Sequence, residues 1–312
     1  RPDELALLRA DKDFTDLPAP EQHIFNSHLT RQILLDSVKG RAPTAAFGPI
    51  CSLPELETWF TTWTFSETIH SRSYTHIIRN IYSNPSKVFD ELMDIAPIVD
   101  CAGDISKYYD DLIRCNEMLS GHSAHSIEPI NHKKALWLAL MSVNVLEGIR
   151  FYVSFACSWA FAEVKKMEGN AKIIKFIARD ENLHLAGTQA LLKLLPKDDP
   201  DYAKIAKECE ADCIKLFEDA VAQEEAWADY LFKHGPVIGL NASILKDFMD
   251  FTASNALKEI GIKYASTAPK TTPIPWFNKH SNQSNKQSAL QETESTNYVI
   301  GVMGEGIDYA DL

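Results

Sequence analysis

The chain has little of what sheet proteins and disulfide-bonded proteins are built from. Its 312 residues include only 13 glycines and 15 prolines, and no segment sustains an alternation of apolar and polar residues. Because turn residues and alternation are typical of β-sheets, their scarcity favours an all-α protein. The six cysteines form no C-x-x-C pair and no regular framework. This usage is typical of reduced cytosolic thiols, although Cys209 and Cys213 share a helix face and leave a zinc or redox role open.

Basic residues and clean apolar runs are also scarce. The chain carries 31 basic and 43 acidic residues, a net charge of −12, without a basic block. Such a chain is a poor partner for nucleic acid or for an anionic membrane. The longest apolar region, residues 135–164, contains Asn144, Glu147 and Arg150, so it is not a clean membrane span. We expect it to be the central helix of a large core, in a cytoplasmic protein without a signal peptide.

Two Glu-x-x-His motifs are the most informative residues present: Glu67-Thr-Ile-His70 and Glu181-Asn-Leu-His184. A spacing of three puts Glu and His on one face of a helix, about one turn apart. Two facing helices of this kind offer two imidazoles and two carboxylates. One carboxylate from each of two further helices would complete a set that holds two metal ions in a four-helix bundle. The candidates for these last two are Asp36 and Glu147.

Helical periodicity places all six residues on apolar stripes. Apolar residues recur at steps of three and four in residues 21–39, 54–82, 133–167 and 171–195. In each segment the ionisable residue lies on the apolar stripe, where a solvated charge is not expected. Further helices are expected at 104–120, 201–233 and 241–263, and loops at 39–49, 121–131 and 196–200.

Acids on these stripes need a cation beside them. Burying an unpaired carboxylate costs several kcal/mol or forces it to protonate. Four carboxylates and two histidines facing inward therefore indicate two metal ions, and such donors suit iron or manganese. The alternative is a set of buried salt bridges, for which Arg150 and Arg179 are the nearest cations in sequence. Asp180 points off the ligand face, where it could accept a hydrogen bond from a metal-bound histidine.

Tyr74 lies one turn beyond His70 on the same stripe. It is either a core tyrosine with a satisfied hydroxyl or a redox residue beside a metal pair. In the second case the phenol gives up one electron and a proton. An apolar pocket would then protect the radical from water, formed by Ile177, Phe151 and Phe155.

The composition changes after Pro275. Residues 278–297 are polar and cannot bury enough surface to fold alone, whereas the last fifteen residues regain apolar side chains. We expect a helical domain at 1–277 and a flexible tail at 278–312. Such a tail is either a frayed end or a peptide that docks on a partner protein.

Several long motifs resemble the small (β) subunit of class Ia ribonucleotide reductase, in its bacterial and phage branch. They are residues 34–41 (LLDSVKGR), 66–80 (SETIHSRSYTHIIRN), 140–155 (LMSVNVLEGIRFYVSF), 168–184 (from EGNAK to ARDENLH) and 273–276 (PIPW). The similarity covers nearly the whole chain. It implies a ferritin-like helical bundle with additional helices, a homodimer, and an oxo-bridged pair of iron ions formed with O2, with manganese as the alternative metal.

The resemblance also implies roles for single residues. By residue matching, the metal ligands would be Asp36, Glu67, His70, Glu147, Glu181 and His184. Tyr74 would carry a stable radical that leaves toward a large (α) subunit, where ribonucleotides are reduced to deoxyribonucleotides. Asp180 matches a carboxylate on that route. In the tail, Glu292 and Tyr298 match the segment that relays the radical and binds the α subunit.

Two features depart from the family pattern. The family's transfer tryptophan directly precedes the segment that opens this chain at Arg1, so long-range transfer would need a longer or separate polypeptide. The connection at 121–131 is shorter than the family's β-hairpin there, for which we expect a peripheral effect. A diiron oxidase or monooxygenase of the same fold is the alternative function. An iron-storage or structural bundle ranks last, because such proteins are generally shorter and lack this tail.

Overall fold

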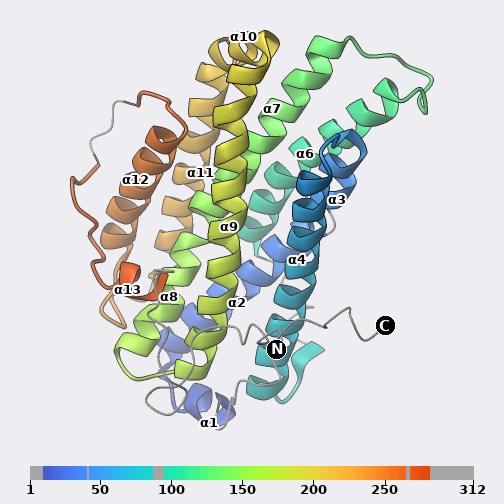
Figure 1. Ribbon diagram of the computed structural model, residues 1–312. Coiled ribbons are helices and arrows are strands. Elements are labelled where there is room, and N and C mark those ends of the chain that lie inside the picture. The colour runs from blue at the N-terminus through green and yellow to red at the C-terminus, as the bar shows by residue number, and fades with distance from the viewer. Residues whose placement is uncertain (1–9, 41, 87–94, 265–267, 282–312) are drawn as a thin grey trace, which may run out of the picture. The chain divides into compact units, whose positions relative to one another are not determined.

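Four long helical runs surround the centre of the part of the chain that the structure describes, which is residues 10–40, 42–86, 95–264 and 268–281 (Figure 1). In this computed structural model three of the runs are single helices: α2 (Ala19–Lys39), α4 (Pro54–Ile81) and α9 (Glu168–Asp198). The fourth run consists of three elements joined end to end: α7 (Pro129–Val145), η3 (Leu146–Arg150) and α8 (Tyr152–Glu163). They match the four segments predicted from the apolar stripes. The all-α prediction is confirmed, because the described residues contain no strand and only an isolated bridge between Val237 and Leu240.

The other helices of the described residues cover this centre. They are α1 (Ala10–Thr15), α3 (Ala42–Phe47), η2 (Gly48–Ile50), α6 (Ala96–Leu119), α10 (Pro200–Glu208), α11 (Glu210–Leu231), α12 (Ala242–Glu259), and α13 (Phe277–Ser281). The three additional helices expected from the sequence correspond to α6, to the α10–α11 pair and to α12.

Two of the predicted loops contain more helix than expected. Residues 39–49 include α3 and most of η2, whose turns are too short to show a periodic stripe. α9 continues through Pro196, and the backbone N–H of Asp199 still donates to the carbonyl of Leu195 at 3.0 Å. The Asp199 side chain then accepts from the backbone N–H of Asp201 at 2.9 Å and caps α10. One residue therefore ends one helix and starts the next.

The ends of the longer helices follow the usual capping preferences. α4 begins at Pro54, whose fixed φ and missing N–H suit the first helical position. Glu55 and Glu57 lie in its first turn and Arg79 in its last, which complements the helix dipole. Asn241 caps α12 by accepting a hydrogen bond from the first turn. These local signals fix where the site-bearing helices start and stop.

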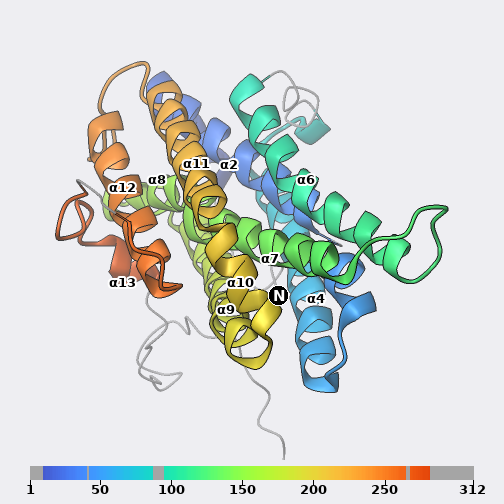
Figure 2. The same cartoon turned by 90° about the horizontal axis from the view of Figure 1, so that it is seen from above.

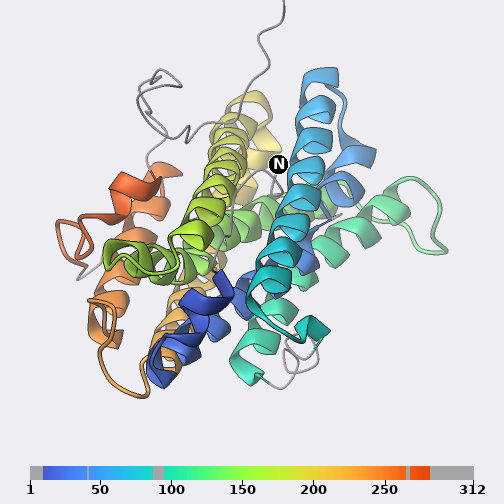
Figure 3. The same cartoon turned by 90° about the horizontal axis from the view of Figure 1, so that it is seen from below.

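α4 and α9 lie side by side through the bundle, as Figures 1 and 3 both show. Gly187 permits their close approach, because a Cβ there would lie 2.2 Å from Cζ2 of Trp59. α2 packs against α4 and α8, and α9 also packs against α7 and η3. Seen from above, α6 flanks α7 on one side and α11 flanks it on the other (Figure 2). The metal-binding candidates thus sit on neighbouring helices.

The joined run Pro129–Glu163 is interrupted by a π-helical turn, η3. The sequence predicts one uninterrupted helix here, since the steps from Val143 to Glu147 and from Glu147 to Phe151 are both four residues and fit either geometry. By length and composition the run could cross a membrane, but 83% of its most apolar window is buried within the protein. Such burial agrees with the expected central core helix.

The described residues up to Ser281 belong to one compact unit. α13 spans the predicted boundary between residues 277 and 278. The tail from 282 to 312 lies outside the described residues, so the division into a helical domain and a docking tail stays a prediction.

Candidate metal centre

The six predicted ligand side chains come together in the core of the bundle. Their donor atoms form two overlapping groups, each with all members within 4.8 Å of one another: Asp36, Glu67, His70 and Glu181, and Glu67, Glu147, Glu181 and His184. All six side chains are buried, with exposed fractions between 0% and 3%. Glu67 and Glu181 belong to both groups. Each of these two carboxylates can therefore bridge a pair of metal ions, while the other four donors serve one ion each.

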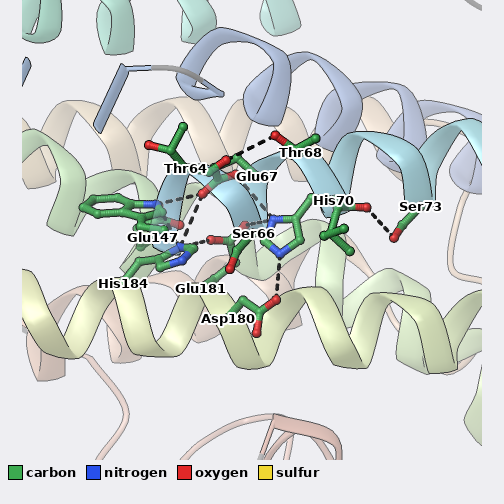
Figure 4. A network of polar contacts seen from close by, with 12 residues as sticks. Thr64, Ser66, Glu67, Thr68, His70, Ser73, Glu147, Asp180, Glu181 and His184 are labelled. Carbon is green, nitrogen blue, oxygen red and sulfur yellow. Dashed lines mark hydrogen bonds and ion pairs between the residues drawn. The ribbon is translucent and has the colours of Figure 1, made fainter. Parts of the chain in front are cut away.

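At one end of the cluster, His70 lies among three carboxylates (Figure 4). Its Nδ1 is 3.4 Å from Oε2 of Glu67 and 3.3 Å from Oε1 of Glu181, and its Nε2 is 3.1 Å from Oδ2 of Asp180. Burial lowers the pKa of His70, but the charge of Glu181 and hydrogen bonds to Asp180, Glu181 and Glu67 raise it well above its ordinary value. Without metal the ring is a cation among acids. A metal at Nδ1 would replace that charge and leave Nε2–H donated to Asp180.

At the other end, His184 lies among three carboxylates and stacks on an aromatic ring. Its Nδ1 lies 2.9 Å from Oε2 of Glu181, 3.4 Å from Oε1 of Glu67 and 3.9 Å from Oε1 of Glu147. The imidazole stacks on the indole of Trp63, with ring centroids 4.8 Å apart and planes inclined by 22°. The indole N–H of Trp63 donates to Oε1 of Glu67 at 2.8 Å. Trp63 therefore orients a histidine and a bridging carboxylate at once.

Sequence reasoning placed Trp63 on the α4 stripe but gave it no role. Its signal was its position: Trp63 is four residues before Glu67, on the same helix face, which is where an indole N–H can reach a carboxylate one turn away.

Glu147 reaches the cluster from the π-helical turn η3. Hydrogen bonds from i to i+5 widen the turn, and such turns inside α-helices occur frequently at functional sites. Gly148 lies beside it, and a Cβ there would be 3.4 Å from a methyl group of Leu185 on α9. The glycine inside an otherwise apolar helical stretch is the one sequence signal that could have located this turn.

The donor chemistry fits a pair of metal ions. Four buried carboxylates and two imidazoles are ligands for iron or manganese, and the absence of sulfur from the set argues against iron–sulfur chemistry. The two arginines considered as alternative partners have other contacts. Arg150 donates to Sγ of Cys101 at 2.8 Å and to Gln223, and Arg179 lies over the ring of Phe176.

Tyr74 is buried next to Asp36, with 2% of its surface exposed. Burial raises the pKa of Tyr74 well above its ordinary value, and the charge of Asp36 raises this pKa further. The more distant charges of Glu181 and Glu67 act in the same direction. The phenol therefore keeps its proton at neutral pH, and oxidation of the ring must release a proton together with the electron.

The structure places the remaining predicted residues as follows. Asp180 contacts His70, as its position next to a ligand predicted. Phe151, Phe155 and Ile177 are buried, and the two phenylalanine rings stack with centroids 5.5 Å apart. Their protection of a Tyr74 radical stays a prediction. Glu292 and Tyr298 lie outside the described residues, so their roles stay predictions as well.

Sequence comparisons relate the chain to one family. Residues 2–273 match the family model described as ribonucleotide reductase, small chain. The chain is 49% identical over 323 residues to the ribonucleoside-diphosphate reductase subunit beta of Haemophilus influenzae, which covers 100% of this chain and 86% of the relative. It is 43% identical over 329 residues to the corresponding subunit of Enterobacteria phage T4, with 99% and 85% covered.

Solved structures share the fold. A ribonucleotide reductase R2 subunit from Clostridium botulinum superposes with a TM-score of 0.78 at 24% identity, covering 90% of this chain and 83% of the other. An R2-like ligand-binding oxidase with a manganese/iron cofactor gives a TM-score of 0.61 at 15% identity, covering 84% and 89%. The predicted ferritin-like helical fold is thereby confirmed.

Proposed function

This chain belongs to the family of ribonucleotide reductase small chains, and we propose that it generates the radical with which its enzyme reduces ribonucleotides. It is the small subunit of a ribonucleoside-diphosphate reductase, an oxidoreductase. The observation that carries the proposal is the buried set of six donors with the protonated phenol of Tyr74 beside one of them.

Two metal ions would be held by terminal donors at either end and by shared donors between them. Asp36 and His70 serve one ion, Glu147 and His184 the other, and Glu67 and Glu181 both. When bound, the metal pair would use O2 as the oxidant for the one-electron oxidation of a nearby side chain. We propose iron as the metal, because oxygen and nitrogen donors suit it. Manganese accepts the same donors, and one protein of this fold carries manganese and iron together.

Tyr74 is the residue we propose to be oxidised. Asp36 is the carboxylate whose charge acts most strongly on the Tyr74 phenol, so we propose that it takes the phenol proton when the electron leaves. Burial keeps water away from the ring. Phe151, Phe155 and Ile177 are the apolar side chains proposed to shield it, since a radical persists longest where it has no reductant or proton donor in contact.

The pair of His70 and Asp180 is proposed to connect the centre to the surface. The side chain of His70 is 1% exposed and that of Asp180 is 15% exposed, so the pair leads outward. We propose that the radical leaves this way toward a large subunit that also binds the tail at 278–312 through Glu292 and Tyr298. The homodimer and the cytoplasmic location implied by the resemblance belong to the same proposal. An oxidase role has only the shared fold in its favour.

Aerobic reconstitution with iron(II) tests this function. We expect two metal ions per chain and an electron paramagnetic resonance (EPR) signal of a tyrosyl radical, because both ligand groups are complete. Tyr74→Phe should keep the metal and lose the signal. Tyr152→Phe is the matched control, since Tyr152 is a partly buried tyrosine near another ligand candidate, and desolvation together with the charge of Glu147 raises its pKa to about 12. A tyrosyl signal that survives in Tyr74→Phe would show that the wrong phenol has been assigned.

A further inference from the structure

Cys101 is a buried cysteine that lies between two arginines and belongs to neither group of ligand candidates. Its Sγ is 2.8 Å from Nη1 of Arg150 and 3.4 Å from Nη2 of Arg31. We propose that Cys101 is a thiolate that reacts with hydrogen peroxide, which makes it a site of reversible oxidation to sulfenic acid. This chemistry needs no metal ion.

Four elements that meet in the core supply the site. Cys101 belongs to α6 and Arg31 to α2, while Arg150 lies in η3. Glu224 belongs to α11, against which the other three elements pack. All four side chains are buried, with exposed fractions between 0% and 4%. Arg31 pairs with Glu224 and lies over the ring of Trp227, 4.8 Å from its centroid. These contacts hold one guanidinium group in place beside the sulfur.

The two guanidinium groups favour a negatively charged sulfur. A guanidinium keeps its proton inside a protein, so both arginines are cations. A neutral thiol is a weak hydrogen-bond acceptor, whereas a thiolate accepts charge-assisted hydrogen bonds from both sides. Reactive cysteines are found beside such cations, because the thiolate is the nucleophile. The contacts of Cys101 are therefore those of a reactive cysteine.

Cys157 on α8 shows what burial does without such contacts. It is 0% exposed, as Cys101 is, and burial raises the pKa of the Cys157 thiol well above its ordinary value. A thiol of this kind keeps its proton at neutral pH and is inert. Cys157 is therefore a matched internal control for Cys101.

A cavity leads a small oxidant to the arginine side of the site. It has a volume of about 190 Å³, and its lining includes the exposed Lys107 and Asp219 and the buried Ser142 and Arg150. Hydrogen peroxide is little larger than water, which occupies about 30 Å³ in the liquid, so the cavity can admit it. A peroxide molecule there reaches Arg150, whose guanidinium contacts the sulfur.

The reaction balances with peroxide as its one co-reactant. The thiolate attacks one oxygen of hydrogen peroxide, an S–O bond forms as the O–O bond breaks, and hydroxide leaves. The sulfur is oxidised by two electrons and the peroxide is reduced by two. Nε and Nη1 of Arg31 are buried and have no hydrogen-bond acceptor among the described residues. These N–H groups are available to the oxygen that the sulfur gains.

Ultraviolet absorption tests the charge of the sulfur. The native full chain at neutral pH is compared with Cys101→Ser and with Cys157→Ser. We expect Cys101→Ser to lose the absorption of one thiolate and Cys157→Ser to lose none, because the Cys157 thiol is protonated. Identical thiolate absorption in the wild type and in Cys101→Ser overturns the proposal.

Peroxide treatment tests the reactivity. The full chain, without added iron, is exposed to hydrogen peroxide, and the excess is removed with catalase. The protein is then unfolded in dimedone, which marks sulfenic acid for mass spectrometry. We expect Cys101 to be marked about tenfold faster than Cys157, because the thiolate is the reacting form. Equal rates at the two cysteines would contradict the assignment.

Two variants separate the charge from the packing. Arg150→Met removes the nearer cation and should slow the oxidation of Cys101, and Arg150→Lys restores a cation and should react faster than Arg150→Met. A loosened fold cannot imitate the slower reaction, because it would expose the sulfur and speed its oxidation. A rate in Arg150→Met equal to that of the wild type or above it rules out activation by the arginines.

Discussion

The two ends of the metal centre are built from the same donors but have different surroundings. At the end of Asp36 and His70, Tyr74 is buried near the charge of Asp36 and makes no ring stack with any of the described residues. At the end of Glu147 and His184, the ligand ring is stacked on Trp63, which contacts the tilted ring of the partly exposed Trp59. The comparison teaches that the aromatic surroundings, rather than the kinds of donor, distinguish the two ends: a buried phenol lies at one end and packed indole rings lie at the other.

The largest expected effect comes from removing a donor common to both ends. Glu181→Ala deletes a carboxylate that belongs to both ligand groups and contacts both histidines. We expect loss of both metal ions at concentrations that saturate the wild type, measured by metal analysis after desalting. Glu163→Ala is a control that removes a carboxylate outside the cluster, whose partners among the described residues are Lys279 and His280 on α13. Full occupancy in Glu181→Ala would contradict the shared-donor arrangement.

A substitution at one end should lower the binding affinity for one metal ion more than for the other. Asp180→Asn weakens the acceptor that orients His70, and the loss of such a partner typically costs about 10–100-fold in metal affinity. We expect a manganese(II) titration to show one weakened and one nearly unchanged binding step, because His184 does not contact Asp180. The comparison of the two ends breaks down if both steps weaken equally.

The smallest effect concerns the packing of Trp59 beside the end formed by Glu147 and His184. Gly187→Ala places a methyl group against the ring of Trp59, and overpacking of this kind costs about 1–3 kcal/mol. Because alanine favours a helix over glycine by about 1 kcal/mol, we expect a net loss of about 1 kcal/mol in the free energy of unfolding of the metal-free protein, measured in urea. In a Trp59→Leu background the same change should stabilise. Equal effects in both backgrounds would show that the ring contact does not matter.

The ligand set could be predicted because its residues break a simple rule. Glu67, Glu147 and Glu181 lie on apolar stripes where charges do not belong, and this conflict is visible in the sequence alone. The proximity of Tyr74 to Asp36 joins two helices and depends on their packing. Periodicity placed both residues inward but could not set their distance.

The features that sequence reasoning missed are those that look ordinary in a sequence. Trp63 on an apolar stripe is indistinguishable from a core tryptophan until its N–H is seen to meet Glu67. The turn η3 is hidden because residue steps of four fit an α-helix as well as a π-helix. α3 and η2 are too short for any periodic signal, so a loop was expected in their place.

The wide turn at Leu146–Arg150 affects how this protein can change in length. In a regular helix, deleting one residue rotates everything downstream by about 100° and destroys the packing. Deleting one residue within η3 would instead allow ordinary i to i+4 bonding to run through, and α7 and α8 would keep their orientations. Only the orientation of the Glu147 side chain toward the ligand cluster would be lost. A lineage could therefore give up its metal by a single codon deletion and keep a well-packed bundle, and a gap at this place in a related sequence would be the trace of that event.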